Sequence, residues 1–223
     1  MHWNFRKIIG FEQMSIPKYI LRMVHWQNVE YILQHGMSCR GHALEDPDYV
    51  NIGMRDLIVV RHEHPIPIEG KGNLGDYVPF YFGGHSPMLY MIKNGYGGVG
   101  QKPQNDLVFI LCKYETVKEE CLPFVFTDKN AKIALANFYE NESDFDKLNW
   151  ESIYTRNWAS DEINLARKEL KQAEFLIHQH VPVTCIHALV VKTSERKEYF
   201  EEKIRNLGLT ITVYIDKNCK LYY

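Results

Sequence analysis

The chain has 223 residues, of which 45% are hydrophobic and 24% are charged, and its formal net charge at pH 7 is −2. This length and composition are typical of one globular domain and argue against extended disorder. A protein that binds duplex DNA through phosphate contacts is usually more basic, so the charge argues against that class of protein.

Two further features of the sequence bear on the cellular setting. No apolar run approaches the roughly 20 residues that span a bilayer, and residues 1–14 lack the apolar stretch of a secretory signal. The five cysteines form no C-x-x-C pair, which argues against a disulfide framework and against a zinc ribbon. We therefore expect a cytoplasmic protein with reduced thiols and no membrane segment.

The first third of the chain is predicted to form one strand, one helix and a long loop. Residues 15–25 carry β-type side chains, and residues 26–36 place apolar residues at helical spacing before Gly36, which fits a C-terminal stop. Residues 37–75 are rich in proline and glycine and predict a long connection. Connections of this length in compact domains are usually functional or mobile.

The middle of the chain contains the clearest strand. Residues 107–113 form an apolar run, as expected for a strand buried on both faces, and residues 121–131 predict a second extended segment. Residues 76–82 also read as extended, but Pro79 argues against a central strand. A short helix is predicted over 86–95.

The last third mixes helices with strands. The pattern predicts helices over 131–141 and 159–172, strands over 172–178 and 185–192, a helix over 194–208 that Gly208 ends, and a closing hairpin over 209–223. Strands and helices do not alternate regularly along the chain, which favours an α+β fold over a doubly wound sheet.

Glu174 is the most unusual residue of the predicted strands. Its neighbours Ala173, Phe175 and Leu176 are apolar, and a carboxylate rarely occupies such a run unless it is paired, hydrogen-bonded or used in chemistry. The alternative is a strand end at which Glu174 is solvated or forms an ion pair with Lys171.

Other polar residues give weaker indications. Arg61 follows an apolar run, and an arginine in that setting is most often the solvated end of an element. The histidines at 62–64 and 178–180 match neither the H-E-x-x-H helix nor a Cys/His finger, so we expect no metal site. No G-x-G-x-x-G or Walker A pattern is present, which argues against Rossmann and P-loop nucleotide binding.

The aromatic residues allow two interpretations. Those of 76–82, together with Tyr90, Tyr96 and 124–126, could form core or could form a platform on which unpaired bases stack.

Seven segments together resemble one family. They occur in order between about residue 18 and the C-terminus: HWQNVEYIL (25–33), DYVPFYF (76–82), SPMLY (86–90), LPFVFTD (122–128), NWA (157–159), KQAEFL (171–176) and the final Tyr222-Tyr223 pair. This ordered set resembles the DarT-type DNA ADP-ribosyltransferase toxins.

The resemblance implies a fold, an activity and partners. The implied fold is a single domain over 1–223 with a split antiparallel sheet, flanking helices and long functional loops. The implied activity is transfer of ADP-ribose from NAD, a co-substrate, onto a base of single-stranded DNA, typically thymidine, without a metal. The implied setting is a toxin–antitoxin pair with a DarG-like macrodomain antitoxin, and we expect a monomer.

The resemblance also assigns roles to residues. It implies that Glu174 and Arg61 are catalytic; that Arg22, Met23, Val24, Tyr31, Cys39 and Arg61 bind NAD; and that His85, Ser86, Pro87, Met88, Leu89 and Tyr90 contact DNA. Arg22 departs from the family, which commonly has a histidine there, and His85 occupies a position where a basic residue is usual. Because arginine is a poor base, we expect Arg61 to orient a pyrophosphate or a base.

Two other functions are consistent with the sequence. The chain could be an ADP-ribosyltransferase acting on guanosine, RNA or protein, and the near-neutral charge fits RNA or protein better than DNA. It could also be a non-catalytic module of the same fold that binds single-stranded nucleic acid or an antitoxin.

Overall fold

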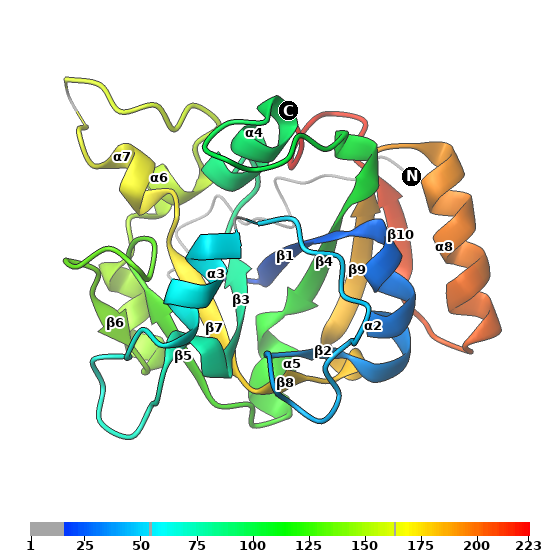
Figure 1. Ribbon diagram of the computed structural model, residues 1–223, viewed down its shortest axis with the longest axis horizontal. Coiled ribbons are helices and arrows are strands. Elements are labelled where there is room, and N and C mark those ends of the chain that lie inside the picture. The colour runs from blue at the N-terminus through cyan, green and yellow to red at the C-terminus, as the bar shows by residue number, and fades with distance from the viewer. Residues whose placement is uncertain (1–15, 54, 163) are drawn as a thin grey trace.

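The computed structural model describes residues 16–53, 55–162 and 164–223, and its centre is an eight-stranded sheet (Figure 1). The strand order is β10-β9-β4-β1-β3-β7-β5-β6, and a two-stranded sheet, β2-β8, lies beside it. All neighbouring pairs in the large sheet are antiparallel except β9 and β10. The predicted α+β class with a mainly antiparallel sheet is therefore confirmed.

The strands are β1 (Tyr19–His25), β2 (Met37–Ser38), β3 (Tyr77–Tyr81), β4 (Leu107–Lys113), β5 (Phe124–Thr127), β6 (Phe138–Tyr139), β7 (Glu174–His178), β8 (His180–Val181), β9 (Ile186–Val191) and β10 (Thr212–Ile215). The α-helices are α2 (Val29–His35), α3 (Arg55–His62), α4 (Pro87–Asn94), α5 (Tyr114–Glu119), α6 (Trp150–Tyr154), α7 (Arg167–Leu170) and α8 (Ser194–Asn206). Short 3-10 turns are η1 (Trp26–Asn28), η2 (Leu74–Asp76), η3 (Gln104–Asp106), η4 (Glu142–Lys147) and η5 (Val183–Cys185).

The sheet is buried on both faces at its centre. Along β4, Val108 and Ile110 point into one core cluster, whereas Leu107 and Phe109 point into another. This alternation follows from the two-residue period of a strand. The prediction that residues 107–113 form a strand covered on both sides is therefore confirmed.

Glycine ends two helices as predicted. Gly36 follows α2 with φ 78°, and Gly95 follows α4 in the left-handed conformation with φ 69°. Glycine reaches this region without the steric cost that a β-carbon imposes. Ser86 caps the start of α4, where its hydroxyl accepts a hydrogen bond from the Leu89 amide.

The prediction that Pro79 excludes a central strand is wrong. β3 lies between β1 and β7, and all five of its residues pair with β7. The opposite edge of β3 pairs with β1 only at Leu21↔Tyr81. In a strand, the N–H and C=O of one residue point to the same side, and the Pro79 carbonyl accepts from Arg22 on β1. The missing N–H of Pro79 therefore faces the place where the sheet splits and no ladder bond is needed.

The helices predicted over 131–141 and 159–172 are largely wrong. The first segment consists of turns that lead into β6, which pairs with β5 at Phe126↔Tyr139. The second is helical only in α7, and residue 163 lies outside the described residues. Helix propensity is worth less than 1 kcal/mol per residue, so sheet pairing and turns override it. The long loop at 37–75 contains α3, and α5 follows β4; the sequence pattern predicted neither helix.

The closing hairpin is also wrong. β10 pairs in parallel with β9, and α8 connects the two strands. The last residues are instead held by the Asp216 carboxylate, which accepts from the amides of Lys220, Leu221 and Tyr222. Among the described residues, none of the helices combines the length and the apolar character that crossing a membrane requires.

Candidate active site

Glu174 is the first residue of β7, and its side chain is only 2% exposed. Its two oxygens accept hydrogen bonds from the two terminal nitrogens of Arg61, Nη1 to Oε1 at 3.1 Å and Nη2 to Oε2 at 2.5 Å. The sequence separates these residues by 113 positions, and Arg61 is carried by α3. Such a two-point contact fixes the orientation of a carboxylate as well as its charge.

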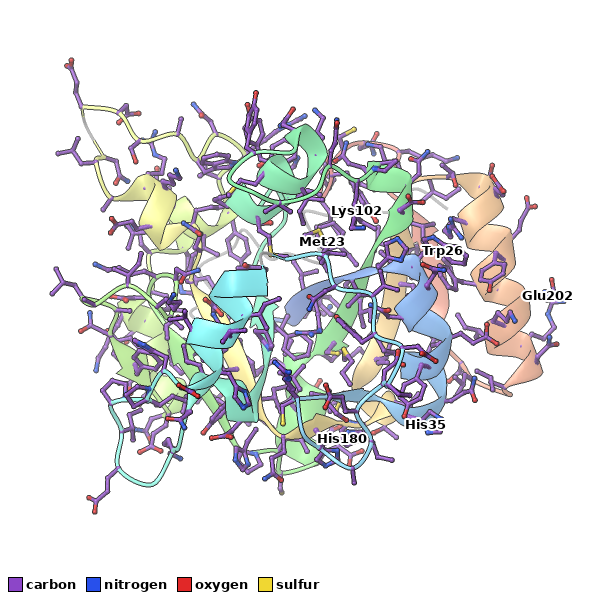
Figure 2. All side chains as sticks on the ribbon, viewed as in Figure 1. Met23, Trp26, His35, Lys102, His180 and Glu202 are labelled. Carbon is purple, nitrogen blue, oxygen red and sulfur yellow. The ribbon has the colours of Figure 1, made fainter. Side chains whose placement is uncertain are left out.

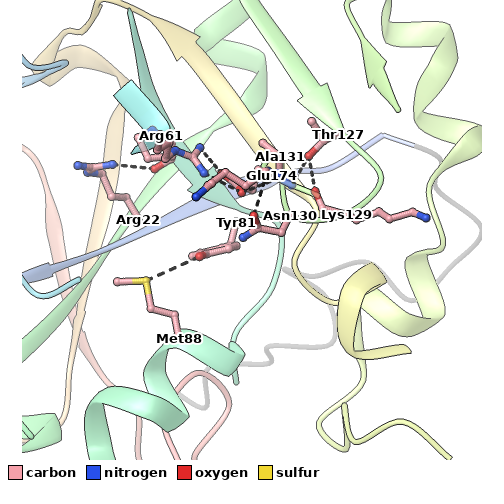
Figure 3. A network of polar contacts seen from close by, with 11 residues as sticks. Arg22, Arg61, Tyr81, Met88, Thr127, Lys129, Asn130, Ala131 and Glu174 are labelled. Atoms are coloured by element: carbon pink, nitrogen blue, oxygen red, sulfur yellow. Dashed lines mark hydrogen bonds and ion pairs between the residues drawn. The ribbon is translucent and has the colours of Figure 1, made fainter. Parts of the chain in front are cut away.

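The end of β5 and the turn that follows it provide further hydrogen bonds to Glu174 (Figure 3). The Ala131 amide donates to Glu174 Oε1 at 3.0 Å, and the Glu174 amide donates to the Thr127 hydroxyl at 3.2 Å. That hydroxyl in turn donates to the Lys129 carbonyl at 2.6 Å. The carboxylate is therefore held by a cation on one side and by a backbone N–H on the other.

Asp128 stabilises this turn through hydrogen bonds with Asn137. Its carboxylate accepts from the amide nitrogen of Asn137 at 2.9 Å and from the side-chain nitrogen of the same residue at 2.7 Å. Both bonds join residues that are nine positions apart, and Ala131 lies between them in the chain. The position of the Ala131 amide against Glu174 thus depends on the Asp128–Asn137 contact.

The charge state of the pair follows from its surroundings. Burial lowers the pKa of Arg61, but the charge and hydrogen bonds of Glu174 outweigh burial and raise the pKa above its ordinary value. Burial, with the charge of Glu174, also raises the pKa of Tyr81, which lies opposite Glu174 in the β3–β7 register. Arg61 stays a cation and Tyr81 stays a neutral hydroxyl.

The alternative ion pair between Glu174 and Lys171 is wrong. The Lys171 ammonium donates to the Ile153 carbonyl at 2.6 Å, and burial lowers its pKa to about 7. Glu174 is bound by Arg61 instead. The solvated strand end is also excluded, because the Glu174 side chain is buried.

Arg22 lies at the split between β1 and β3. Its guanidinium donates to the Pro79 carbonyl at 2.8 Å and to the Tyr49 hydroxyl at 3.4 Å, and its buried Nε atom has no hydrogen-bond partner among the described residues. Within the part of the chain that the structure describes, the β3-facing edge of β1 has no ladder pairing beyond Leu21. The backbone of residues 22–25 therefore presents an unpaired edge there.

The other predicted NAD residues differ in accessibility. Met23 and Val24 are buried on opposite faces of β1, and Met23 (Figure 2) packs in the cluster that contains Leu89. Tyr31 is partly exposed on α2, whereas Cys39 is 8% exposed beyond β2. Burial raises the pKa of the Cys39 thiol, so it is a neutral side chain.

The predicted DNA-contacting stretch is mostly buried. Ser86 and Leu89 serve as cap and core of α4, and only Met88 and Tyr90 have accessible side chains. Burial, and then the charge of Arg156, lowers the pKa of His85 to about 4, so His85 is neutral near pH 7. His85 therefore stands where the family usually has a basic residue but is neutral, and its contact with DNA stays a prediction.

The α4 helix is nevertheless close to Glu174. The Tyr81 hydroxyl donates to Met88 Sδ at 3.7 Å, and Figure 3 shows this contact beside the Arg61–Glu174 pair. The structure thus brings together Glu174, Arg61, Arg22 and Met88 around β3. Sequence reasoning missed Tyr81 and the Ala131 amide; only the register of β3 with β7 and the path of the turn assign them to the site.

No group of three or more His, Cys, Asp and Glu side chains is placed to hold a metal ion in the part of the chain that the structure describes. The histidines at 62–64 and 178–180 thus form no such group.

Comparisons with known proteins agree with this geometry. The sequence model of the family described as "ssDNA thymidine ADP-ribosyltransferase, DarT" matches residues 21–223. The chain belongs to the DarT family. A DNA ADP-ribosyl transferase of Escherichia coli is 34% identical over 195 residues, which cover 87% of this chain and 89% of that protein.

Solved DarT structures share the fold. DarT of Thermus sp. 2.9 in complex with ADP-ribosylated ssDNA has a TM-score of 0.83 and 29% identity, covering 93% of this chain and 97% of that chain. The same Thermus protein in complex with NAD+ has a TM-score of 0.79, with 93% and 98% covered at 29% identity. DarTG of Thermosipho africanus in complex with ADP-ribose shares the fold at 20% identity, with a TM-score of 0.68 over 89% of this chain and 50% of that one.

The predicted family, fold and activity are thereby confirmed. This DarT-family chain is a DNA ADP-ribosyltransferase that uses NAD as co-substrate. The roles of individual residues remain predictions.

Proposed function

We propose that Glu174 and Arg61 are the catalytic pair with which this chain transfers ADP-ribose from NAD onto a thymidine base of single-stranded DNA. One observation carries the assignment: a carboxylate at the start of an apolar strand is held in a fixed orientation by an arginine from a distant helix. A buried pair of this kind costs desolvation energy, so its retention favours a use beyond stability.

The chemistry defines what Glu174 has to do. The bond between nicotinamide and ribose breaks, nicotinamide leaves with the bonding electrons, and positive charge develops on the ribose. A thymine ring nitrogen attacks the anomeric carbon of this ribose, to which nicotinamide was bound, and loses its proton. The products are ADP-ribosyl-DNA, nicotinamide and one proton. An ionised Glu174 hydrogen-bonds the ribose 2′-hydroxyl and stabilises the positive charge where it develops.

Arg61 orients rather than removes protons. Its pKa is raised, so it remains a cation throughout and is a poor base. Its side chain is 21% exposed, and in the proposal it meets a pyrophosphate or the target base while it holds Glu174. Proton removal from thymine therefore falls to Glu174 or to solvent.

NAD binds at the split of the sheet in this proposal. The unpaired edge of residues 22–25 offers backbone donors and acceptors, and the Arg22 guanidinium lies beside it. Because Met23 and Val24 are buried side chains, their contacts with NAD are made by backbone. Tyr31 on α2 and Cys39 after β2 are the remaining NAD contacts of the proposal.

The wider setting is proposed from the family. Residues 1–223 act as one domain and as a monomer, in the cytoplasm, as the toxin of a toxin–antitoxin pair. A DarG-like macrodomain antitoxin removes the modification. The name DarTG of the Thermosipho relative is consistent with such a pairing.

The decisive experiment is mass spectrometry of an oligonucleotide incubated with the protein and NAD, followed by mapping of the modified base. We expect a gain of one ADP-ribose on thymidine in single-stranded DNA, and none on duplex DNA, RNA or protein. Glu174→Gln, which keeps the side-chain volume, is expected to abolish the product while thermal unfolding remains cooperative. A Glu174→Gln protein that still modified the oligonucleotide would refute the catalytic assignment, and modification of guanosine would correct the base.

A further inference from the structure

An aromatic cluster is built around α4. Tyr90 is at its centre, with ring centroids 6.0 Å from Tyr96, 5.5 Å from Trp158 and 5.6 Å from Tyr223. The four rings come from α4, from the loop that follows it, from the segment after α6 and from the C-terminus. We refer to Tyr90, Tyr96, Trp158 and Tyr223 as the aromatic platform.

The platform is exposed on one side. Tyr96 is 55% exposed and Tyr90 is 36% exposed, whereas Trp158 and Tyr223 are half-buried beneath them. Tyr96 meets Tyr90 at an interplanar angle of 56°, so much of the Tyr96 ring lies open to solvent. Large rings left open in this way need a reason beyond packing of the core.

The platform is also built to be rigid. The Trp158 indole donates to the Tyr223 hydroxyl, which in turn donates to the His85 carbonyl at 2.7 Å. The Tyr223 backbone is held at both ends by the side chain of Gln104. Beneath Tyr96, the loop is tied to α4 by the bond from the Tyr96 amide to the Met91 carbonyl at 3.0 Å.

Basic side chains surround these rings. Lys93 Nζ lies 5.8 Å from the centroid of the Tyr223 ring, and Lys192 Nζ donates to the Tyr223 carbonyl at 3.3 Å. The exposed Arg156 is close enough for its charge to act on both His85 and Tyr223. Open aromatic faces beside cations suit a ligand with flat rings and a negatively charged backbone, which is the chemistry of unpaired nucleic acid.

We infer that the aromatic platform stacks a nucleobase of the DNA strand next to the base that reacts, with Tyr96 as the principal stacking surface. This inference rests on the proposed function, which places the reacting base at Glu174. The start of α4 contacts Tyr81 through Met88, and Tyr90 is two residues further along the same helix. In this inference, a strand that delivers a base to Glu174 continues over α4, and a neighbouring nucleotide meets the platform.

Binding of a fluorescent thymidine-containing oligonucleotide, measured by anisotropy without NAD, tests the inference apart from transfer. Stacking on one aromatic side chain is typically worth about 1–3 kcal/mol, so Tyr96→Ala is expected to raise the dissociation constant about 5- to 150-fold. Tyr96→Trp keeps a stacking surface and is expected to restore binding. Leu207→Ala removes an exposed apolar side chain at the end of α8 and is the matched control, with unchanged binding.

An abasic scan identifies the stacked position. The wild-type protein is expected to lose affinity when the base is removed at one position beside the target, and Tyr96→Ala is expected to show no further loss there. Equal binding by wild type and Tyr96→Ala, or the same abasic profile in both, would overturn the platform while transfer by the wild type left the proposed function intact. A wild-type protein that neither bound nor modified any single-stranded oligonucleotide would reject both.

Discussion

The large sheet divides where the pairing between β1 and β3 stops, and the antiparallel strands on either side of this division bury different kinds of side chain. On one side β4 and β9 bury apolar side chains on both faces, and the first six residues of β4 are all buried. On the other side β7 begins with a charged residue that needs Arg61 and the Ala131 amide to be buried at all. Burial of an apolar side chain contributes about 1.5–3 kcal/mol, whereas burial of a carboxylate costs several kcal/mol before compensation.

This difference shows how the molecule separates stability from chemistry. Continuous ladders and apolar faces are concentrated in β4, β9 and β1. The polar residues gather where the ladder between β1 and β3 stops and where a turn follows β5. Changes on the two sides should therefore affect different measurements.

The largest loss of stability is expected from a substitution in β9. Leu189 on β9 is fully buried in the main core cluster, and Leu189→Ala removes buried methyl groups and leaves a cavity. We expect a loss of about 2–5 kcal/mol in the free energy of unfolding, measured by urea denaturation. Transfer per folded molecule should not change. A fall in that specific activity would show that the two sides are not independent.

A loss of transfer is expected for Arg61→Ala. Loss of the guanidinium should reduce the transfer rate by about 10²- to 10³-fold, equivalent to about 2.7–4 kcal/mol, because Glu174 is no longer oriented. Arg61→Lys keeps a charge without the two-point geometry and should fall in between. The double variant with Glu174→Gln should be no slower than the slower single variant. Additive losses would mean that the two residues act separately.

A smaller effect is expected when the Asp128–Asn137 contact in the turn after β5 is removed. Asp128→Ala leaves the amide and side chain of Asn137 without their acceptors, so we expect a loss of about 1–3 kcal/mol in stability. The looser turn should also slow transfer by about tenfold, equivalent to about 1.4 kcal/mol, as measured in single-turnover assays. Asp146→Ala, an exposed carboxylate in η4, is the control. Normal transfer by a folded Asp128→Ala protein would show that the Asp128–Asn137 contact is not needed to position the Ala131 amide.

The most gradual effect, the smallest for each pH unit, is a dependence of stability on pH. Burial lowers the pKa of Lys171 to about 7 from 10.5, so between these values the unfolded chain binds more protons than the folded one. Stability of the wild type should therefore rise from about pH 7 towards pH 10 by about 1.4 kcal/mol per pH unit, relative to Lys171→Met. Urea denaturation at several pH values measures this slope. Parallel curves for the two proteins would show that Lys171 is neutral throughout or is charged in both states.

Several elements were predictable because their causes are local. The strand at 107–113, the helix over 29–35 and the glycine stops at Gly36 and Gly95 follow from patterns within a few residues. The unusual position of Glu174 was also visible, since a carboxylate in an apolar strand is rare. Predictions failed where a distant partner decided the outcome, as with residues 131–141, which favour helix but in which Phe138 and Tyr139 pair with β5.

The amino-acid sequence by itself determined the strands with two apolar faces, the places where helices end, and the family to which the chain belongs. Only the tertiary structure decided that Arg61 rather than Lys171 pairs with Glu174, that β3 is a central strand despite Pro79, and that His85 is buried and neutral. Local patterns depend on side-chain period and backbone preference, which neighbours in the chain define. The site depends on strand register and on desolvation, which exist only after segments more than 100 residues apart have come together.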